Sequence, residues 1–120
     1  MWLFFLKKSM KKAYRVKKNE DFTKIIHQRQ SVANKDFVLY YMKNESHLRA
    51  GISVSKKLGH AVVRNKIKRQ VRMMVHEVFD HEYACDCVII VRKHYLTQDY
   101  ATNKQSLLSL YEKTKKRMGK

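Results

Sequence analysis

The chain has 120 residues, of which 44% are hydrophobic, and its 27 Lys or Arg against 10 Asp or Glu give a formal net charge of +17 at pH 7. The length suits one domain, and the hydrophobic share excludes a wholly disordered chain. So many positive charges repel one another in the folded chain, which favours a polyanionic partner. Nucleic acid is the leading candidate, and an anionic membrane surface is the second.

The first residues of the chain differ from the rest. The apolar run Trp2–Leu6 has five residues, whereas a membrane span needs about 20, so no membrane partner is expected. The run also lacks the basic region and the small-residue cleavage site of a signal peptide. Met10 begins a segment typical of a cytoplasmic start. We therefore expect residues 1–9 to be an upstream extension and residues 10–120 to form a single domain.

The first half of this domain predicts one helix followed by strands. A helix is expected over residues 19–29, which begin with Asn19, a good N-cap residue. Its apolar side chains share one face: Phe22, Ile25 and Ile26. Residues 32–43 alternate large side chains as a strand does, and a bend would divide them into two strands. Residues 44–46 are expected to be a turn, and residues 49–54 the second strand of a hairpin.

The second half predicts two helices around a central strand. Residues 55–60 are expected to form a loop before a helix over residues 61–78, whose apolar side chains repeat every three or four residues. The apolar run 87–91 is typical of a central strand, and a last helix runs from residue 99 or 102 to 116. The order α-β-β(-β)-α-β-α predicts an α+β fold. We expect a two-layer α/β sandwich, with a sheet of about four strands covered on one side by helices.

Positive charge is concentrated in the middle of the chain. Residues 46–76 contain eight Lys or Arg and no Asp or Glu. Three of these cations lie along one side of the expected helix, at intervals of four residues: Arg64, Lys68 and Arg72. Like charges at this spacing destabilise an isolated helix, and a merely solvated face usually mixes both signs, so the row indicates an anionic ligand. Lys56 and Lys57 precede the helix N-terminus, where they could help to hold a phosphate group.

Aromatic residues form the second candidate feature. Side chains of the first helix and first strand could stack on unpaired RNA bases: Phe22, Phe37 and Tyr40. The alternative for Phe22 and Phe37 is that they are ordinary core residues. Tyr40 and its neighbour Tyr41 point to opposite faces of the strand, so at most one of them can face the core.

The two cysteines favour a structural role. Cys85 and Cys87, with His81 nearby, could suggest a metal. A structural zinc site needs four ligands, however, and usually contains a Cys-x-x-Cys pair. Two cysteines at this spacing in a strand rarely close a disulfide, so we expect buried, reduced cysteines in a cytoplasmic protein.

Several segments together resemble the bacterial ribonuclease P protein component. They are residues 17–22 (KKNEDF), 31–34 (SVAN), 37–40 (FVLY), 51–59 (GISVSKKLG) and 61–69 (AVVRNKIKR). The resemblance runs from about Met10 to the last helix, and the long central block is its most specific part. Three residues depart from the family pattern, since Ile26 replaces an aromatic residue, His60 an Asn and Lys66 an Arg.

The resemblance implies a protein that binds a large catalytic RNA and assists the removal of the 5′ leader from precursor transfer RNA. The RNA and its bound Mg²⁺ ions perform the hydrolysis, so neither a catalytic nor a metal-binding side chain is expected in the protein. The implied partners are the catalytic RNA and precursor transfer RNA, with weak self-association of the holoenzyme as a further expectation. The implied fold contains a left-handed β-α-β crossover, an exception to a strong rule.

The resemblance also assigns residues to two surfaces. The helix over residues 61–78 would contact the catalytic RNA through Arg64, Asn65, Lys66, Lys68, Arg69 and Arg72. A cleft between the first helix and the sheet would take the leader through Phe22, Phe37 and Tyr40, with Asn34, Lys56 and Lys57 nearby.

Three other interpretations stay open. A structural RNA-binding protein of ribosomal type would use the same charge without a leader cleft. A DNA-binding module is less favoured, because no helix-turn-helix pair or dimer seam is evident. An independent ribonuclease could use His60 and His76, which flank the basic helix, as its acid and base.

Overall fold

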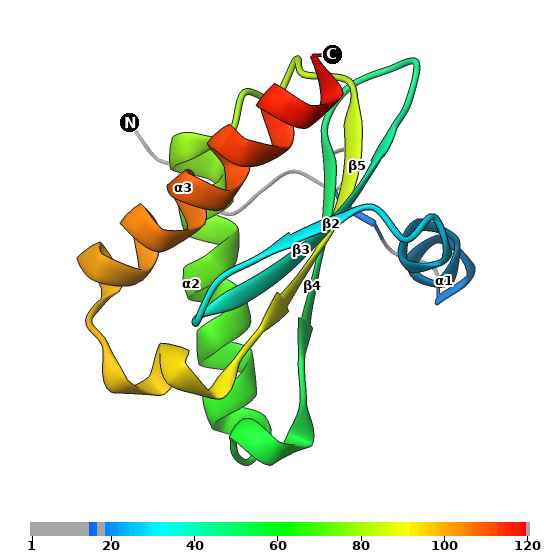
Figure 1. Cartoon of the computed structure of the whole chain (residues 1–120). Coiled ribbons are helices and arrows are strands. Elements are labelled where there is room, and N and C mark those ends of the chain that lie inside the picture. Colours follow the sequence, from blue (N-terminus) through cyan, green and yellow to red (C-terminus); the bar gives the residue numbers. More distant parts are fainter. Residues whose placement is uncertain (1–14, 17–18, 120) are drawn as a thin grey trace, which may run out of the picture.

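A computed structural model describes residues 15–16 and 19–119 (Figure 1). The elements in chain order are α1 (Asn19–His27), β2 (Ser31–Ala33), β3 (Phe37–Lys43), β4 (Arg49–Val54), α2 (Ala61–Val78), β5 (Cys85–Val91) and α3 (Tyr100–Met118). Short 3-10 helices, η2 (Lys56–Leu58) and η3 (Lys93–Thr97), precede α2 and α3. The expected order is confirmed, with the strand over residues 32–43 divided in two. The expected extension over residues 1–9 lies outside the described residues.

Local side-chain bonds explain where the elements around α2 and α3 begin. The side chain of Asp99 caps α3 by accepting a hydrogen bond from the Thr102 backbone amide. The Ser55 hydroxyl accepts one from the Lys57 amide, which turns the chain into η2 directly after β4. Gly59 ends η2 at a φ of 147°, a conformation that side-chain-bearing residues rarely adopt. The chain therefore reverses within a few residues and enters α2.

β5 lies inside the sheet, whose strand order is β2-β3-β5-β4. It pairs antiparallel with β3 and parallel with β4. The expectation of a central strand is confirmed, but the expected hairpin of β3 with β4 is wrong, because β5 separates them. β5 takes this place because apolar side chains on both of its faces are best buried between two neighbours. β4, α2 and β5 form a β-α-β unit, and its left-handed crossover stays a prediction.

Helices cover both faces of the sheet, which corrects the expectation that they cover one side (Figure 1). α2 and α3 pack on one face, where Leu39, Val71 and Leu107 are buried together. α1 packs on the opposite face, where Ile25 contacts Val88. The reason lies in β3, whose alternate residues are large on both sides, so that each face needs cover.

Candidate RNA-binding site

The basic face of α2 lies beside its buried stripe. The stripe consists of Ile67, Val71, Met74 and Val75. The expected row of cations, Arg64, Lys68 and Arg72, is half-buried along the edge of the stripe. Half-burial holds the aliphatic stems against the protein while the charged ends reach the surface. Asn65, Lys66 and Arg69 are exposed. α2 thus presents a basic surface anchored on one side by the core.

Arg72 lies near a second arginine that comes from a distant part of the chain. Val16 donates its backbone amide to the carbonyl of Ala50 at 3.0 Å, and Arg15 bridges to Ala50 along the outer edge of β4. Burial lowers the pKa of Arg72, and the neighbouring charge of Arg15 lowers it further. The charge of Arg15 therefore adds to the positive potential around Arg72 at this end of the row. Sequence periodicity gave no signal for Arg15, since only the folded chain brings it here.

Arg64 connects the cation row with the loop before α2. Its Nε atom donates a hydrogen bond to the carbonyl oxygen of Gly59 at 3.2 Å. Lys56 and Lys57, which we expected near the leader, are exposed in η2 on this same loop. His60, the N-cap residue of α2, makes no side-chain capping hydrogen bond. The loop lysines therefore lie beside the α2 row and extend its positive surface past the helix N-terminus.

Lys66 lies apart from the row. It lines a separate hollow of about 210 Å³, together with Val63, Leu96 and other residues of α2 and η3. Val63 and Leu96 are among the large hydrophobic residues that remain exposed, at 39% and 46%. The cations of α2 thus divide between two flanks of the helix.

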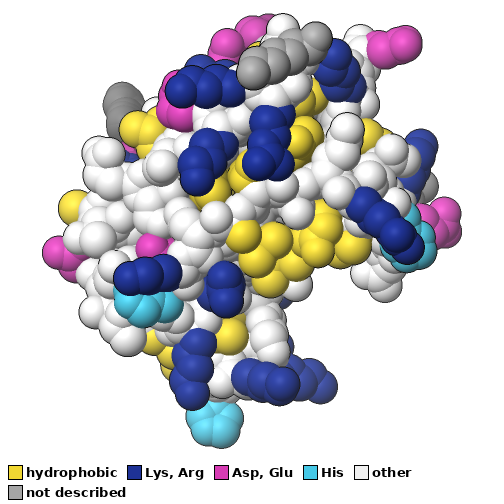
Figure 2. All heavy atoms as spheres, viewed as in Figure 1, with side chains coloured by type: hydrophobic (Ala, Val, Ile, Leu, Met, Phe, Trp, Pro, Cys, Tyr) yellow, Lys and Arg dark blue, Asp and Glu magenta, His cyan; other side chains and the backbone are white. Residues whose placement is uncertain are grey.

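An apolar surface lies on the opposite face of the sheet. We call it the α1-side surface, and it consists of half-buried side chains packed on the buried residues of that face: Phe22, Ile26, Tyr40, Met42 and Ile90. Figure 2 shows hydrophobic side chains in a hollow between the sheet and α1, with Lys and Arg side chains around it. Partly exposed aromatic rings edged by cations suit single-stranded nucleic acid, which offers bases to stack and phosphates to neutralise.

Sheet register brings the two aromatic residues of this surface to one level. Tyr40 pairs with Val88, and Val88 pairs with Gly51, so these residues form a row across three strands. The Phe22 ring packs on Gly51 at one end of the row, because a Cβ atom at Gly51 would lie 2.5 Å from Phe22 Cζ. Tyr40 stands at the other end, about two strand spacings or roughly 10 Å away. A glycine inside a strand is itself a signal of close approach.

Two residues that we expected to contact the leader belong elsewhere. Phe37 is fully buried on the α2 and α3 face, where its ring makes an edge contact with Tyr95 at 5.7 Å between centroids. Phe37 cannot share a surface with Tyr40, because residues three apart in a strand point to opposite faces. This is a correction in favour of the core alternative.

The side chain of Asn34 also has a structural role. Its Oδ1 atom accepts hydrogen bonds from the backbone amides of Asp36 and Phe37, both at 2.9 Å. Its Nδ2 atom donates to the hydroxyl and the carbonyl oxygen of Ser106. The side chain therefore closes the turn between β2 and β3 and ties it to α3, which corrects its placement among the leader contacts.

The histidines and cysteines do not assemble a catalytic or metal site within the described residues. His60 and His76 lie at opposite ends of α2, about 24 Å apart at 1.5 Å per residue, too far for a shared acid–base step. His76 contacts His81 instead, at 5.2 Å between ring centroids. In the described part of the chain, no three His, Cys, Asp or Glu side chains lie together as metal ligands.

The cysteines are free and buried, as expected. Burial raises the pKa of the Cys85 thiol to about 11 and that of Cys87 well above its ordinary value. Both thiols are therefore protonated core groups. No helix among residues 19–119 has the length and apolar character that crossing a membrane requires.

Comparison with known proteins identifies the family. Residues 10–115 match the family model described as Ribonuclease P. The chain is 49% identical over 107 residues to the ribonuclease P protein component of Streptococcus gordonii, covering 88% of this chain and 90% of that protein. The corresponding protein of Listeria welshimeri is 46% identical over 106 residues, covering 82% and 86%.

Solved structures agree with the sequence relatives. The RNase P protein of Staphylococcus aureus superposes with a TM-score of 0.79 at 43% identity, covering 87% of this chain and 97% of that chain. The RNase P protein of Thermotoga maritima has a TM-score of 0.73 at 33% identity, covering 82% and 96%. The chain therefore belongs to the ribonuclease P protein family.

Proposed function

We propose that this chain is the protein subunit of ribonuclease P, and that it assists the endonucleolytic removal of the 5′ leader from precursor transfer RNA in the cytoplasm. α2 binds the catalytic RNA, and the α1-side surface binds the single-stranded leader. One observation carries the two-site assignment: Val16 packs with α1 while its neighbour Arg15 lies near Arg72 of α2. The basic surface and the aromatic surface thus meet around the edge of β4.

This arrangement supports a role in holding two polyanions together. The catalytic RNA and the leader repel each other, and a subunit with a net charge of +17 lowers that repulsion where they meet. Phe22 and Tyr40 contact bases that only the precursor possesses, which favours the precursor over the mature product. The hydrolytic chemistry belongs to the RNA and its Mg²⁺ ions in this proposal.

The side chains of the two surfaces do not fit a Mg²⁺ site, since they are cations, amides and apolar groups, whereas Mg²⁺ prefers carboxylate and phosphate oxygens. The protein therefore lowers the Mg²⁺ concentration that the RNA requires through its positive charge.

In this proposal the holoenzyme also self-associates weakly. The same +17 charge opposes direct contact between two protein subunits.

A reconstitution assay tests this function. Precursor transfer RNA is incubated with the catalytic RNA at low Mg²⁺, with and without the protein. We expect the protein to restore cleavage at the mature 5′ end and to cleave nothing alone. RNA binding without restored cleavage would favour a ribosomal-type protein instead. Cleavage by the protein alone would favour an independent ribonuclease.

A second assay separates the two surfaces. Phe22→Ala and Tyr40→Ala are expected to lower the preference for precursor over mature transfer RNA by about 5- to 150-fold, because each removes one stacking contact worth roughly 1–3 kcal/mol. Affinity for the catalytic RNA alone is expected to stay unchanged. An equal loss for both RNAs, together with a lower melting temperature, would contradict the assignment of these rings to the leader.

A further inference from the structure

The edge of the sheet opens beside the first residue of β2, because the C-terminal end of β3 extends past it. Ser31 of β2 pairs with Tyr40, but β3 continues to Lys43. Tyr41 still donates its backbone amide to Gln30 at 3.0 Å. Beyond this point the segment after α1 turns away, and the last turn of α3 lies opposite. A hollow of about 410 Å³ remains between them.

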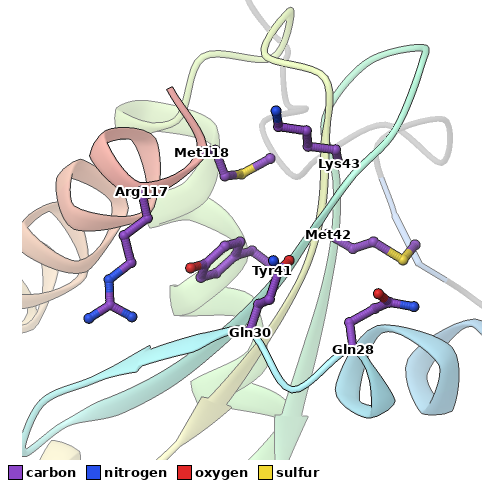
Figure 3. Close-up of a pocket in the computed structure, with 7 residues that line it drawn as sticks. All are labelled: Gln28, Gln30, Tyr41, Met42, Lys43, Arg117 and Met118. Carbon is purple, nitrogen blue, oxygen red and sulfur yellow. The ribbon is translucent and has the colours of Figure 1, made fainter. Parts of the chain in front are cut away.

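Side chains from three parts of the chain line this hollow, which we call the edge pocket (Figure 3). They are Gln28 and Gln30 from the segment after α1, Tyr41, Met42 and Lys43 from β3, and Arg117 and Met118 from α3. The lining thus combines two cations, two primary amides and an apolar base, with no Asp or Glu. Tyr41 and Met118 are buried, whereas both amides and both cations are exposed.

Arg117 is fixed at the mouth of the edge pocket. Its Nη1 atom donates a hydrogen bond to the carbonyl oxygen of Ser31 at 3.0 Å. A guanidinium group has five N–H donors in a planar fork, so most of them remain for a ligand. Lys43 lies at the other end of the pocket (Figure 3), so the two cations favour a ligand with more than one phosphate group, such as an RNA chain.

One carboxylate lies near the edge pocket, and its charge is already balanced. Asp86 pairs with Met42 across β3 and β5. Its oxygens accept two hydrogen bonds from Arg49, at 2.9 and 2.8 Å, and one from Asn44 at 2.7 Å. Because Arg49 and Asn44 hold this carboxylate, it leaves the positive character of the pocket intact.

We propose that the edge pocket binds one nucleotide of single-stranded RNA. Figure 3 shows the Arg117 guanidinium and the Lys43 ammonium at opposite ends of the pocket, so each contacts a different phosphate, one on either side of the nucleotide. The amides of Gln28 and Gln30 donate to and accept from the edge of the base. Tyr41 and Met118, which lie on the α3 side of β3, pack against the face of the nucleotide ring. An acidic peptide would also match the cations and the amides, so RNA is favoured over a peptide by the continuity of the pocket with the α1-side surface, which shares Met42 with it.

The position of the pocket connects it to the α1-side surface. Met42 belongs to both, and Tyr40 and Met42 lie on the same face of β3, roughly 7 Å apart along the strand. RNA that stacks on Tyr40 and continues along β3 therefore reaches the edge pocket next. This proposal rests on the function proposed above, and it adds a nucleotide subsite that lies beyond the two aromatic rings.

The reconstituted holoenzyme tests this subsite with precursors whose leaders increase in length one nucleotide at a time. Arg117→Gln and Gln30→Ala are expected to weaken binding of long-leader precursors by about tenfold, because each removes a polar contact to the nucleotide. Both variants should bind the shortest leaders as the unmodified protein does. Lys113→Gln removes an exposed charge of the same helix and serves as the matched control. Melting temperatures verify that all variants fold.

The outcomes identify the source of the nucleotide. A loss that appears only above a certain leader length assigns the pocket to the leader. A loss for the catalytic RNA alone, at every leader length, assigns it to that RNA. The proposal is overturned if both variants bind every RNA as well as Lys113→Gln does. This holds whether an acidic peptide binds the pocket or no ligand binds it. Failure of the unmodified protein to restore cleavage would contradict the proposed function itself.

Discussion

The phenyl ring of Phe22 packs against the backbone of Gly51, so closely that an added Cβ atom would lie 2.5 Å from Cζ and 2.7 Å from Cε1 of the ring. Gly51 therefore provides the space in which the ring of α1 rests on β4. The ring can lie directly on the backbone because Gly51 has no side chain at this point. A substitution at Gly51 can therefore alter this contact without changing any residue that we propose to bind RNA.

Gly51→Ala is expected to displace the Phe22 ring, since the nearest atoms are the far end of a movable side chain. Binding of the leader should weaken by several-fold, while affinity for the catalytic RNA stays the same. The free energy of unfolding should fall by about 1 kcal/mol, because Phe22 and also Val16, whose Cβ atom would lie 3.1 Å from the added carbon, must shift, and this outweighs the preference for Ala over Gly in a strand. Leader-dependent binding and urea unfolding measure the two effects. Unaltered leader binding would mean that the position of Phe22 does not matter.

Arg69→Ala is expected to weaken binding of the catalytic RNA and to reduce the slope of log affinity against log salt by about one, since one phosphate contact is lost. Arg69 is exposed on α2, so its loss should leave the fold intact. Lys104→Ala is the matched control, because it also removes one positive charge, but from a pair with Glu77 at 3.3 Å. Equal slopes for the two variants would place Arg69 outside the interface.

Asn34→Ala is expected to lower the free energy of unfolding by about 1–3 kcal/mol, because the backbone amides of Asp36 and Phe37 lose their acceptor. Ser106→Ala removes one partner of the Asn34 amide group and one of the Asp36 carboxyl group, but it leaves both backbone amides with their acceptor, so it should have a smaller effect. Chemical denaturation compares the two variants. A stable Asn34→Ala variant with weak leader binding would reverse the correction made above and return Asn34 to the RNA surface.

Asp86→Ala is expected to destabilise the protein by roughly 1–3 kcal/mol. The carboxylate is buried, but Arg49 is 37% exposed and can turn toward water, so the loss should stay below that of a fully buried pair. The hydrogen bond with Asp86, opposed by partial burial, raises the pKa of Arg49, which therefore stays charged. Glu112→Ala removes an exposed carboxylate beside Lys115 and should change stability by less than about 0.5 kcal/mol. Denaturant unfolding of both variants gives the comparison.

Asp36 makes the stability depend on pH in the acid range. Burial acts to raise the pKa of this carboxyl group, but hydrogen bonds with His94, Ser106 and Gln98 outweigh burial and lower its pKa below the ordinary value. The unfolded chain therefore binds the proton more readily than the folded protein. The stabilisation from this group is present above about pH 4 and is lost as pH falls through the lower folded value.

Urea unfolding between about pH 3 and pH 6 measures this contribution. The Asp36→Asn variant is expected to show a shallower loss of stability over the acid part of this range than the unmodified protein. Other carboxyl groups titrate in both proteins and cancel in the comparison. Parallel curves would show that Asp36 titrates alike in the folded and unfolded states.

Features that depend on nearby residues could be predicted from the sequence. The three- and four-residue spacing of apolar side chains in α2 depends only on helix geometry, and its bounds were correct. The opposite burial of Tyr40 and Tyr41 followed from strand alternation. The same alternation separates Phe37 from Tyr40, so placing both in one cleft contradicted information that the sequence already contained.

Features that depend on distant residues could not be predicted in this way. A short turn between residues 43 and 49 favours a local hairpin, and only tertiary packing inserts β5 between the two strands. The side chain of Asn34 meets Ser106, a residue 72 positions away, which no local pattern indicates. Arg15 reaches Arg72 only because residues 15–16 lie beside β4. The edge pocket exists because β2 is shorter than β3, a difference that becomes visible only in the paired sheet.

The central place of β5 has a consequence for how the protein is made. β3 and β4 leave the ribosome first, yet neither pairs with the other, and the strand that joins them begins only at Cys85. A nascent chain that has emerged as far as α2 therefore holds Tyr40 and Gly51 on two strands that nothing yet joins, since β3 can pair only with β2. Pairing over such sequence distances is slow compared with helix formation. The aromatic surface is thus among the last parts to form. Under the proposed function, a prematurely released chain would carry positive charge but lack the surface that distinguishes a precursor from a product.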